Sequence, residues 1–261
     1  MTKNAEDALK PSLPFSWGAA TDIGKVRDEN QDTFLAEPQL ALFLISDGMG
    51  GHRGGELASK IVIEDLPVMI ETSLDKLKVG SPKTIKSLLS RSITEQSRQL
   101  WLEGTSESGF KDMGATLVII LLRNNRCFVA NLGDSRAYLY RKGRLSQLTR
   151  DHSVVSELVQ KGHIEPEEAE NHEAQGQVTS YIGMEEKPRP HVRSFLLQKN
   201  DRLLLCTDGL TDLIDDENIA AILTKEADSQ AVCKALVDAA RVAGGYDNIT
   251  VMTIDWHRLY S

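Results

Sequence analysis

The sequence predicts an α+β fold in which antiparallel β-sheets carry the core. Three observations predict it. Strand-like and helix-like segments come in runs and do not alternate strictly, which argues against a doubly wound parallel sheet. Residues 115–148 are a series of short β-rich segments separated by tight turns, a pattern typical of consecutive hairpins. Two longer segments, 54–70 and 84–103, place apolar residues at helical spacing.

The first part of the chain predicts two strands before these helices. Weak alternation over residues 15–21 predicts the first strand. The apolar run 40–46 predicts a buried strand that stops at the turn-forming pair Asp47 and Gly48. Pro67 stands inside the first helical segment, and we expect it to kink or shorten that helix.

The rest of the chain predicts hairpins, a surface segment and a final α+β portion. The hairpin strands are expected at 115–122, 127–132, 137–140 and 145–148. Residues 151–183 are polar, acidic and partly helical, as expected of a surface insertion. The expected later elements are strands at 192–197 and 202–206, helices at 216–224 and 229–242, and a last strand at 249–254.

Length and composition predict one globular domain. The chain has 261 residues, of which 41% are hydrophobic and 26% charged, enough apolar material for a core without disulfides or structural zinc. Residues 1–15 are expected to be a flexible tail and residues 257–261 a short C-terminal end. The domain would then span 16–256, with a surface flap at about 149–183.

Charge and hydropathy exclude several classes of protein. A net charge of −8 and an isoelectric point near 5.3 argue against a nucleic acid or an anionic membrane as the main partner. No secretory signal and no apolar run long enough for a membrane span is visible, so a cytoplasmic location is expected. Cys127, Cys206 and Cys233 are widely spaced in apolar segments and are expected to be buried free thiols. No coiled-coil heptads are visible, and a monomer is expected.

Four aspartates stand at the ends of apolar strands. Asp47, Asp134 and Asp208 each follow such a strand, and Asp247 precedes the last one. A single aspartate at a strand end is usually a turn former. Four carboxylates buried together without cations would repel one another and lose their hydration, so the pattern predicts bound hard metal ions. Oxygen ligands favour Mg or Mn, and no His/Cys spacing typical of zinc sites competes.

Several well-known motifs fail on inspection. The glycines at 48 and 50 are followed by Arg53 where a dinucleotide-binding motif needs its third glycine. Gly50 and Gly55 have the spacing of a phosphate-binding P-loop, but Glu56 stands where that loop requires lysine. Residues 28–32 begin like a calcium-binding EF-hand loop and then lose its glycine. Since no serine elbow or cysteine phosphate loop is present either, no nucleophile from the protein is indicated.

Seven motifs resemble, in order, those of the protein phosphatase 2C family in its compact bacterial form. They are RDENQD (27–32), ISDGMGGHRGGELAS (45–59), MGATL (113–117), NLGDSRAYLY (131–140), TRDHSVVSELVQKGHI (149–164), CTDGLTD (206–212) and GGYDNITV (244–251). The resemblance implies two antiparallel β-sheets in a central sandwich flanked by antiparallel helix pairs. It implies a metal-dependent protein serine/threonine phosphatase that uses a metal-activated water for direct attack and counteracts Ser/Thr kinase signalling. The implied partners are phosphoproteins, either a Ser/Thr kinase or its targets.

The resemblance also implies a metal centre of two Mn or Mg ions. Asp47 matches the carboxylate that bridges the two ions, and the Gly48 carbonyl matches the backbone ligand. Asp208 and Asp247 match the remaining carboxylates of this centre. Asp134, together with Asp208, matches a third, weaker metal site of bacterial members.

Two further residues match positions around that centre. Asp32 resembles an outer acid that orients metal-bound water, so the implied catalytic set is Asp32, Asp47, Asp208 and Asp247. Arg27 matches the residue that binds the substrate phosphate. A guanidinium can hold two phosphate oxygens at once, a geometry that lysine cannot reproduce.

The chain departs from the family pattern at three places. Met49 stands where eukaryotic members carry a histidine proposed as general acid, and His52 lies near it in sequence. Gln31 replaces a glutamate found in many members, which removes one charge near the metal centre. In the flap, Gln175 and Ser180 stand where relatives have basic residues, so we expect weaker steering of acidic substrates or a different partner.

Two alternatives to an active phosphatase remain open at this stage. The first is a catalytically silent phosphatase-like domain that binds phosphoproteins as a regulator. Degenerate members usually lose metal carboxylates, whereas this chain keeps Asp47, Asp134, Asp208 and Asp247. The second is another two-metal hydrolase such as a nuclease, which the acidic composition disfavours.

Overall fold

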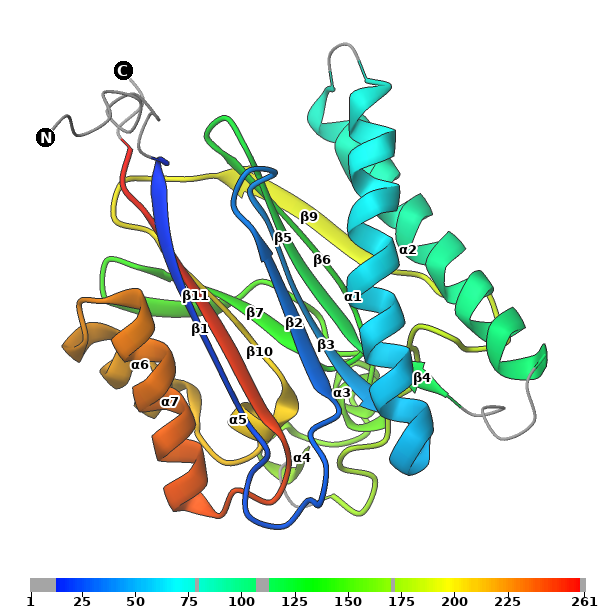
Figure 1. The fold of residues 1–261 in the computed structure, drawn as a ribbon. Helices are drawn as coiled ribbons and strands as arrows, with labels where there is room; N and C mark the ends of the chain where they lie inside the picture. The colour runs from blue at the N-terminus through cyan, green and yellow to red at the C-terminus, as the bar shows by residue number, and fades with distance from the viewer. Residues whose placement is uncertain (1–12, 78–79, 107–112, 170–171, 259–261) are drawn as a thin grey trace, which may run out of the picture.

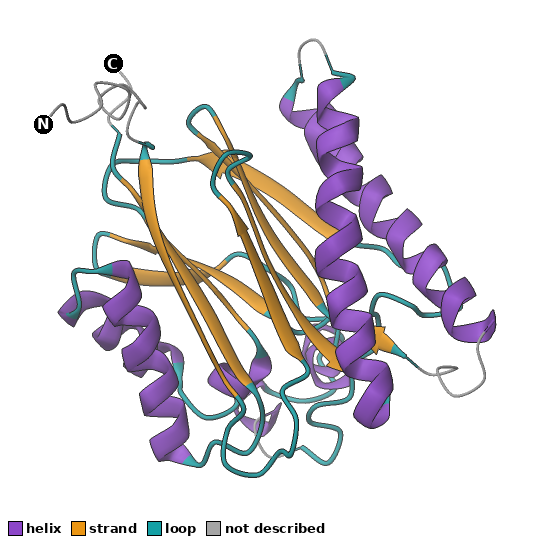
Figure 2. Cartoon of the chain, viewed as in Figure 1, coloured by secondary structure: helices purple, strands orange, loops and turns teal. Residues whose placement is uncertain are grey.

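Two antiparallel sheets lie face to face between two layers of helices in the computed structural model (Figures 1 and 2). It describes residues 13–77, 80–106, 113–169 and 172–258, without the side chains of 51–53 and 167. One sheet has the order β1 (Phe15–Asp22), β11 (Ile249–Trp256), β10 (Arg202–Cys206), β7 (Arg136–Arg141) and β8 (Arg144–Gln147). The other has the order β2 (Asp32–Glu37), β3 (Leu42–Met49), β5 (Leu117–Arg123), β6 (Arg126–Leu132) and β9 (His191–Leu196), and the short β4 (Gly114–Ala115) pairs with β3.

Each sheet is covered on its outer face by a pair of helices. The helices α1 (Gly51–Asp75) and α2 (Pro82–Ser106) cover the β3 sheet, and α6 (Asp216–Lys225) and α7 (Ser229–Ala243) cover the β10 sheet. Short helices α3 (Val154–Gln160), α4 (Pro166–Ala169) and α5 (Asp208–Thr211) lie in the connections at one end of the sandwich (Figure 1). The predicted sandwich with flanking helix pairs is therefore confirmed.

The continuous apolar runs in the sequence arise because the central strands are buried on both faces. In β3, Leu42 and Leu44 point to the core under α1 and α2. Phe43 and Ile45 point the other way, into the core between the sheets, where they meet residues such as Leu205 and Met252. All of these side chains are buried. Alternation of side chains along a strand thus fills two cores from one apolar segment.

The hairpins predicted for the middle of the chain are confirmed. Strands β5 and β6 pair through a turn that contains Asn124 at φ +57°, and β7 and β8 pair through a turn with Lys142 at +52° and Gly143 at +80°. Asparagine and glycine are the residues that most easily adopt this left-handed backbone. The helices predicted at 216–224 and 229–242 correspond to α6 and α7.

Four sequence-based expectations need correction. The helix around Pro67 is not shortened there; α1 continues to Asp75, because Leu66 and Ile70 on either side pack into the core. Asp47 and Gly48 lie inside β3, and the chain turns only at Gly50, with φ +118°. The expected first tail ends earlier, since Phe15 already belongs to β1; residues 1–12 and 259–261 lie outside the described part. The strand β2 was not predicted, because five of its six residues are only partly buried and show no alternation.

The surface flap is also tied into the core more firmly than predicted. Its last residues return to the sheet, where Ile182 is fully buried and bridges to Ala115. Ser153 and Val178 form a second bridge within the flap. One edge of this polar segment is therefore held by backbone pairing next to β4.

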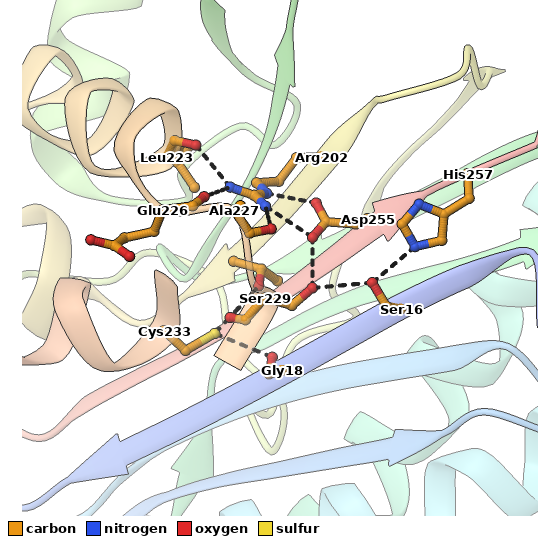
Figure 3. A network of polar contacts seen from close by, with 11 residues as sticks. Ser16, Gly18, Arg202, Leu223, Glu226, Ala227, Ser229, Cys233, Asp255 and His257 are labelled. Atoms are coloured by element: carbon orange, nitrogen blue, oxygen red, sulfur yellow. Dashed lines mark hydrogen bonds and ion pairs between the residues drawn. The ribbon is translucent and has the colours of Figure 1, made fainter. Parts of the chain in front are cut away.

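An ion pair fixes the turn between α6 and α7 against the β10 sheet (Figure 3). Arg202 on β10 binds Asp255 on β11, with Nε–Oδ1 at 2.6 Å and Nη2–Oδ2 at 3.0 Å. The same guanidinium donates to the carbonyls of Leu223, Glu226 and Ala227 at 2.7–2.8 Å, which end α6 and lead into α7. Because these bonds satisfy terminal carbonyls of a helix, they lock the α6–α7 turn onto the sheet.

The three cysteines are buried and free, as predicted. Burial raises the pKa of the Cys206 thiol to about 12 and that of Cys233 to about 11, so neither is a thiolate near neutral pH. Within the described ranges, no helix combines the length and apolar character needed to cross a bilayer.

Candidate active site

A cleft of about 730 Å³ opens where the ends of strands from both sheets meet. Its lining includes all but one of the residues predicted for the site: Arg27, Asp47, Gly48, Asp134, Asp208 and Asp247. The exception is Asp32, which is buried directly behind the lining, 8% exposed, and pairs with Asp47 across β2 and β3. The fold thus brings together residues spread over more than 200 positions.

Antiparallel pairing explains why Asp208 and Asp247 meet. Strand β10 ends at Cys206 opposite Val251 of β11, so the residues after β10 approach those before β11. Thr207 N donates to Thr250 O at 3.0 Å and continues the ladder. Beyond it the two backbones approach so closely that a Cβ on Gly209 would lie 1.9 Å from the Asn248 carbonyl oxygen. A side chain at 209 would therefore push Asp208 and Asp247 apart.

The backbone around Asp47 is fixed by neighbouring polar groups. Its N–H donates to Thr116 Oγ1 at 3.1 Å, and its carbonyl accepts from the Thr116 N–H at 2.8 Å. The next residue, Gly48, donates to the Gln31 carbonyl at 3.2 Å. A Cβ on Gly48 would lie 2.0 Å from the Gly55 carbonyl oxygen, so only glycine fits where β3 passes the start of α1.

Burial and the neighbouring negative charges disfavour ionisation of the aspartates in the cleft. Burial, and then the charges of the neighbouring carboxylates, raise the pKa of Asp47 and Asp208 well above the ordinary value. Burial is also the main cause that raises the pKa of Asp32 and Asp134 to about 6. In the protein without cations, holding these groups together therefore has an unfavourable electrostatic free energy.

The donor set fits hard divalent cations. Asp208 Oδ1 and Asp32 Oδ1 are buried oxygens that accept no hydrogen bond from the described residues. Among the described residues, no three His, Cys, Asp or Glu side chains are placed closely enough to hold one metal ion by themselves. Carboxylates that converge without closing a cage suit Mg or Mn, which keep several water ligands, better than they suit a fully protein-ligated ion.

Arg27 lies at the mouth of the cleft and contacts one of the candidate ligands. Its Nη2 is 2.6 Å from Asp247 Oδ2, and the two side chains are 55% and 36% exposed. The carboxylates of Asp247, Asp47 and Asp208 raise the pKa of Arg27. The guanidinium is thus held beside the carboxylate cluster and is open to an anion from solvent.

Comparisons with known proteins agree with this geometry. The family model described as "Protein phosphatase 2C" matches residues 25–241. The chain belongs to the protein phosphatase 2C family. Protein phosphatase PhpP of Streptococcus pneumoniae is 34% identical over 238 residues, which cover 90% of this chain and 94% of that protein.

Solved structures show the same fold. The serine/threonine phosphatase PstP/Ppp of Mycobacterium tuberculosis has 33% identity and a TM-score of 0.82, and the match covers 94% of this chain and 99% of that one. The catalytic domain of a phosphatase PstP in complex with two manganese ions has 32% identity and a TM-score of 0.80, with 94% and 99% covered. The predicted family, fold class and enzyme class are confirmed: this is a protein serine/threonine phosphatase of a metal-dependent family.

The structure adds one residue of this phosphatase that the sequence did not single out. The side chain of Asn248, which directly follows the candidate ligand Asp247, holds the loop between β1 and β2 that carries Arg27. Its Oδ1 accepts from Gln31 N at 2.8 Å, and its Nδ2 donates to the carbonyls of Ile23 and Glu29 at 3.0 Å each. The signal in the sequence was an amide directly after a candidate ligand, but its partners are more than 200 positions away.

Replacing Asn248 with alanine is expected to weaken substrate binding. The loop around Arg27 loses three hydrogen bonds, each worth about 1 kcal/mol, so we expect KM for a phosphopeptide to rise by roughly 10- to 100-fold. Steady-state kinetics measure the change. Asn218→Ala is the matched control, because the Asn218 side chain donates to Asp215 at the start of α6 and does not line the cleft. An unchanged KM in the Asn248 variant would contradict the positioning role.

The three departures from the family pattern lie around the cleft. Met49 and Gln31 both line it. The side chain of His52 lies outside the described part of the structure. Gly176 and Val178 of the flap form part of the lining, and Gln175 bonds to Asp212. No lysine or arginine from the flap lines the cleft among the described residues.

Proposed function

We propose that this phosphatase hydrolyses phosphoserine and phosphothreonine on proteins with two Mn or Mg ions bound in the cleft. Asp47, the Gly48 carbonyl, Asp208 and Asp247 would hold the two ions, and Asp134 with Asp208 would hold a third more weakly. The observation that carries the proposal is the convergence of buried carboxylates with raised pKa values and unpartnered oxygens beside Arg27.

Side chains around the metal ions have separate proposed roles in binding phosphate and in orienting groups of the site. When bound, the ions supply a water of lowered pKa as the nucleophile and neutralise charge on the phosphoryl oxygens. Arg27 binds two oxygens of the phosphate, and this contact replaces its ion pair with Asp247. Asp32 accepts a hydrogen bond from Thr207 Oγ1 at 3.0 Å, which orients its carboxylate. Its other oxygen, Oδ1, is buried and accepts no hydrogen bond from the described residues.

The proposed partners follow from this chemistry. Phosphoproteins are the substrates, and a Ser/Thr kinase or its targets are the expected partners. We expect the protein to act in the cytoplasm as a monomer, with no nucleic acid or membrane in its function. The domain proposed to carry this activity spans β1 to β11, residues 15–256, with residues 149–183 as a flap beside the cleft. No observation favours the catalytically silent alternative.

One assay tests the proposed function. The wild type should release phosphate from p-nitrophenyl phosphate and from a phosphothreonine peptide when Mn is added, and EDTA should stop both reactions. Turnover that persists in EDTA would exclude metal-dependent hydrolysis. Metal binding without any turnover, measured by calorimetry, would favour the catalytically silent domain.

Arg27 provides a more specific test. Arg27→Ala is expected to lower kcat/KM for a phosphothreonine peptide by roughly 10- to 100-fold, since a charge-assisted bond to phosphate is worth about 1.5 to 3 kcal/mol. Arg27→Lys should recover only part of the loss, because an ammonium cannot make the bidentate contact. Arg123→Ala, at the end of β5, is the control. Equal kcat/KM for Arg27→Ala and the wild type would remove Arg27 from the phosphate site.

A further inference from the structure

A second groove, of about 760 Å³, lies outside the active-site cleft. Residues 90–95 of α2 form one wall, and residues 187–190, in the segment between the flap and β9, form the other. Figure 1 shows this segment, coloured yellow-green, passing beside α2. None of the residues assigned above to catalysis or metal binding lines this groove.

The groove is positively charged. Arg91 from α2 and Lys187 and Arg189 from the opposite wall line it, and all three are exposed. Within the described part of the chain none of them forms an ion pair. The one acidic residue of the lining, Glu95, is already bound by Arg98, with Nη2–Oε1 at 2.6 Å and Nε–Oε2 at 3.1 Å. Three cations are thus left to face solvent.

The wall that carries Lys187 and Arg189 is conformationally restricted. Pro188 and Pro190 fix the backbone φ on either side of Arg189, and Pro188 is buried. The segment is anchored to α2 where Gly183 N donates to Ser97 Oγ at 3.1 Å. A surface that is already ordered loses less entropy when it binds a partner.

The position of these cations is unusual in this protein. The whole chain has a net charge of −8, and the flap carries Gln175 and Ser180 where relatives have basic residues. Glu185 and Glu186 precede Lys187 but do not line the groove. Among the described residues, no cation of the flap lines the cleft, whereas three cations line this groove, where they could attract an acidic substrate.

Backbone pairing connects the groove to the active site. Ile182 bridges to Ala115, and Ala115 pairs with Gly48. Two such steps cover about 5 Å each, and the six residues from Ile182 to Pro188 span at most about 20 Å. The groove therefore lies within about 30 Å of Gly48, a distance that an extended peptide of about nine residues covers.

We propose that this groove docks an acidic segment of the phosphoprotein substrate while the phosphorylated residue occupies the active-site cleft. The inference rests on the proposed function and names the substrate class: phosphoproteins with a cluster of Asp or Glu within about nine residues of the phosphosite. Arg91 and Arg189 bind carboxylates in bidentate geometry, and Lys187 adds a point charge. The positive charge of the groove attracts acidic substrates in place of the basic residues that relatives carry in the flap.

Two phosphothreonine peptides test the proposal, one with four Glu at six to nine residues from the phosphothreonine and one with Gln in their place. The wild type should show a KM for the Glu peptide roughly tenfold lower at low salt, the effect of a few exposed ion pairs. The triple variant Arg91→Glu/Lys187→Glu/Arg189→Glu should lose this preference with kcat unchanged. Salt near 1 M should abolish it in the wild type, because charges are then screened over about 3 Å.

Two control variants keep the proposal open to refutation. Lys234→Glu changes an exposed cation on α7, on the opposite helix layer; an equal loss of preference there would show a net-charge effect and overturn the docking site. Arg91→Ala/Lys187→Ala/Arg189→Ala removes attraction without adding repulsion and should also lose the preference. Equal KM values for the two peptides with the wild type would overturn the proposal.

The test separates failure of the groove from failure of the proposed function. Hydrolysis of p-nitrophenyl phosphate reports the active site alone and should be the same in the wild type and in the triple variants. If the wild type fails to hydrolyse it with Mn, the proposed function is wrong. Fluorescence anisotropy of a labelled Glu-rich peptide without phosphate then measures the groove directly, and binding equal in the wild type and the triple variants would overturn the docking site.

Discussion

Asp208→Asn is expected to lower Mn-dependent hydrolysis of p-nitrophenyl phosphate by at least about 1000-fold, because the variant removes a charged ligand assigned to two metal sites. The same variant should raise the Tm of the metal-free protein. Burial and the neighbouring carboxylates raise the pKa of Asp208, so the neutral amide removes an unfavourable charge. Opposite changes in activity and stability distinguish a metal ligand from a structural residue.

Phosphate release and differential scanning fluorimetry in EDTA measure the two effects. Asp238→Asn, which changes an exposed acid on α7, is the matched control and should alter neither. A variant at position 208 that is both inactive and less stable without metal would mean that Asp208 supports the fold instead of binding cations. Activity near that of the wild type would exclude Asp208 from the metal centre.

Metal removal is expected to destabilise the protein more at high pH than at low pH. Asp32, Asp47, Asp134 and Asp208 hold protons more tightly in the folded metal-free protein than in the unfolded chain. The contribution of these four groups to the free energy of unfolding of the metal-free protein is therefore largest below about pH 4, the pKa of an unfolded aspartate. It falls as pH rises through about 6, where Asp32 and Asp134 ionise, and further as Asp47 and Asp208 follow.

Bound Mn reverses this trend because cations compete with protons for the same oxygens. At a Mn concentration of about 100 times Kd the stabilisation is about 2.7 kcal/mol, which corresponds to a Tm higher by about 5 to 10 °C for a chain of this size. Thermal melts in Mn and in EDTA from about pH 5 to pH 8 measure the gap, which should widen with pH. A gap that is constant or narrows would contradict a cation-binding carboxylate cluster.

The Arg27–Asp247 pair connects the proposed metal centre to substrate binding. The same carboxylate is proposed to bind a cation and, in this structure, contacts the guanidinium proposed to bind phosphate. Because Arg27 is more than half exposed, its contact with Asp247 contributes little to stability. Replacing the Asp247 contact by a phosphate contact therefore requires little free energy, which suits a residue that must bind and release substrate and product repeatedly.

Much of the site could be predicted from the sequence because its residues are tied to local signals. Asp134, Asp208 and Asp247 each lie within two residues of an apolar strand, and Asp47 lies near the end of one. The motif order places Arg27 and Asp32 with them. An acidic residue at a strand end is visible without knowledge of the partner strand. The hairpins at Asn124 and Gly143 were predictable for the same reason, since their turns use residues suited to a left-handed backbone.

Other features depend on contacts between distant segments and could not be predicted. Strand β2 has partly buried side chains without alternation, and only its pairing with β3 defines it. Asn248 gains its role from carbonyls of the β1–β2 loop. The course of α1 through Pro67 is decided by the packing of Leu66 and Ile70, which outweighs the lost backbone hydrogen bond.

Local signals are enough to identify the residues of this protein that can carry charge chemistry at or near strand ends, because side-chain type and strand periodicity are local properties. Contacts between distant segments place Asp32 behind Asp47 and let Asn248 hold the loop of Arg27. They also set Arg91 opposite Lys187 and Arg189 across a groove. Those relations depend on strand register and on helix packing, which are set by long-range burial and not by any single segment.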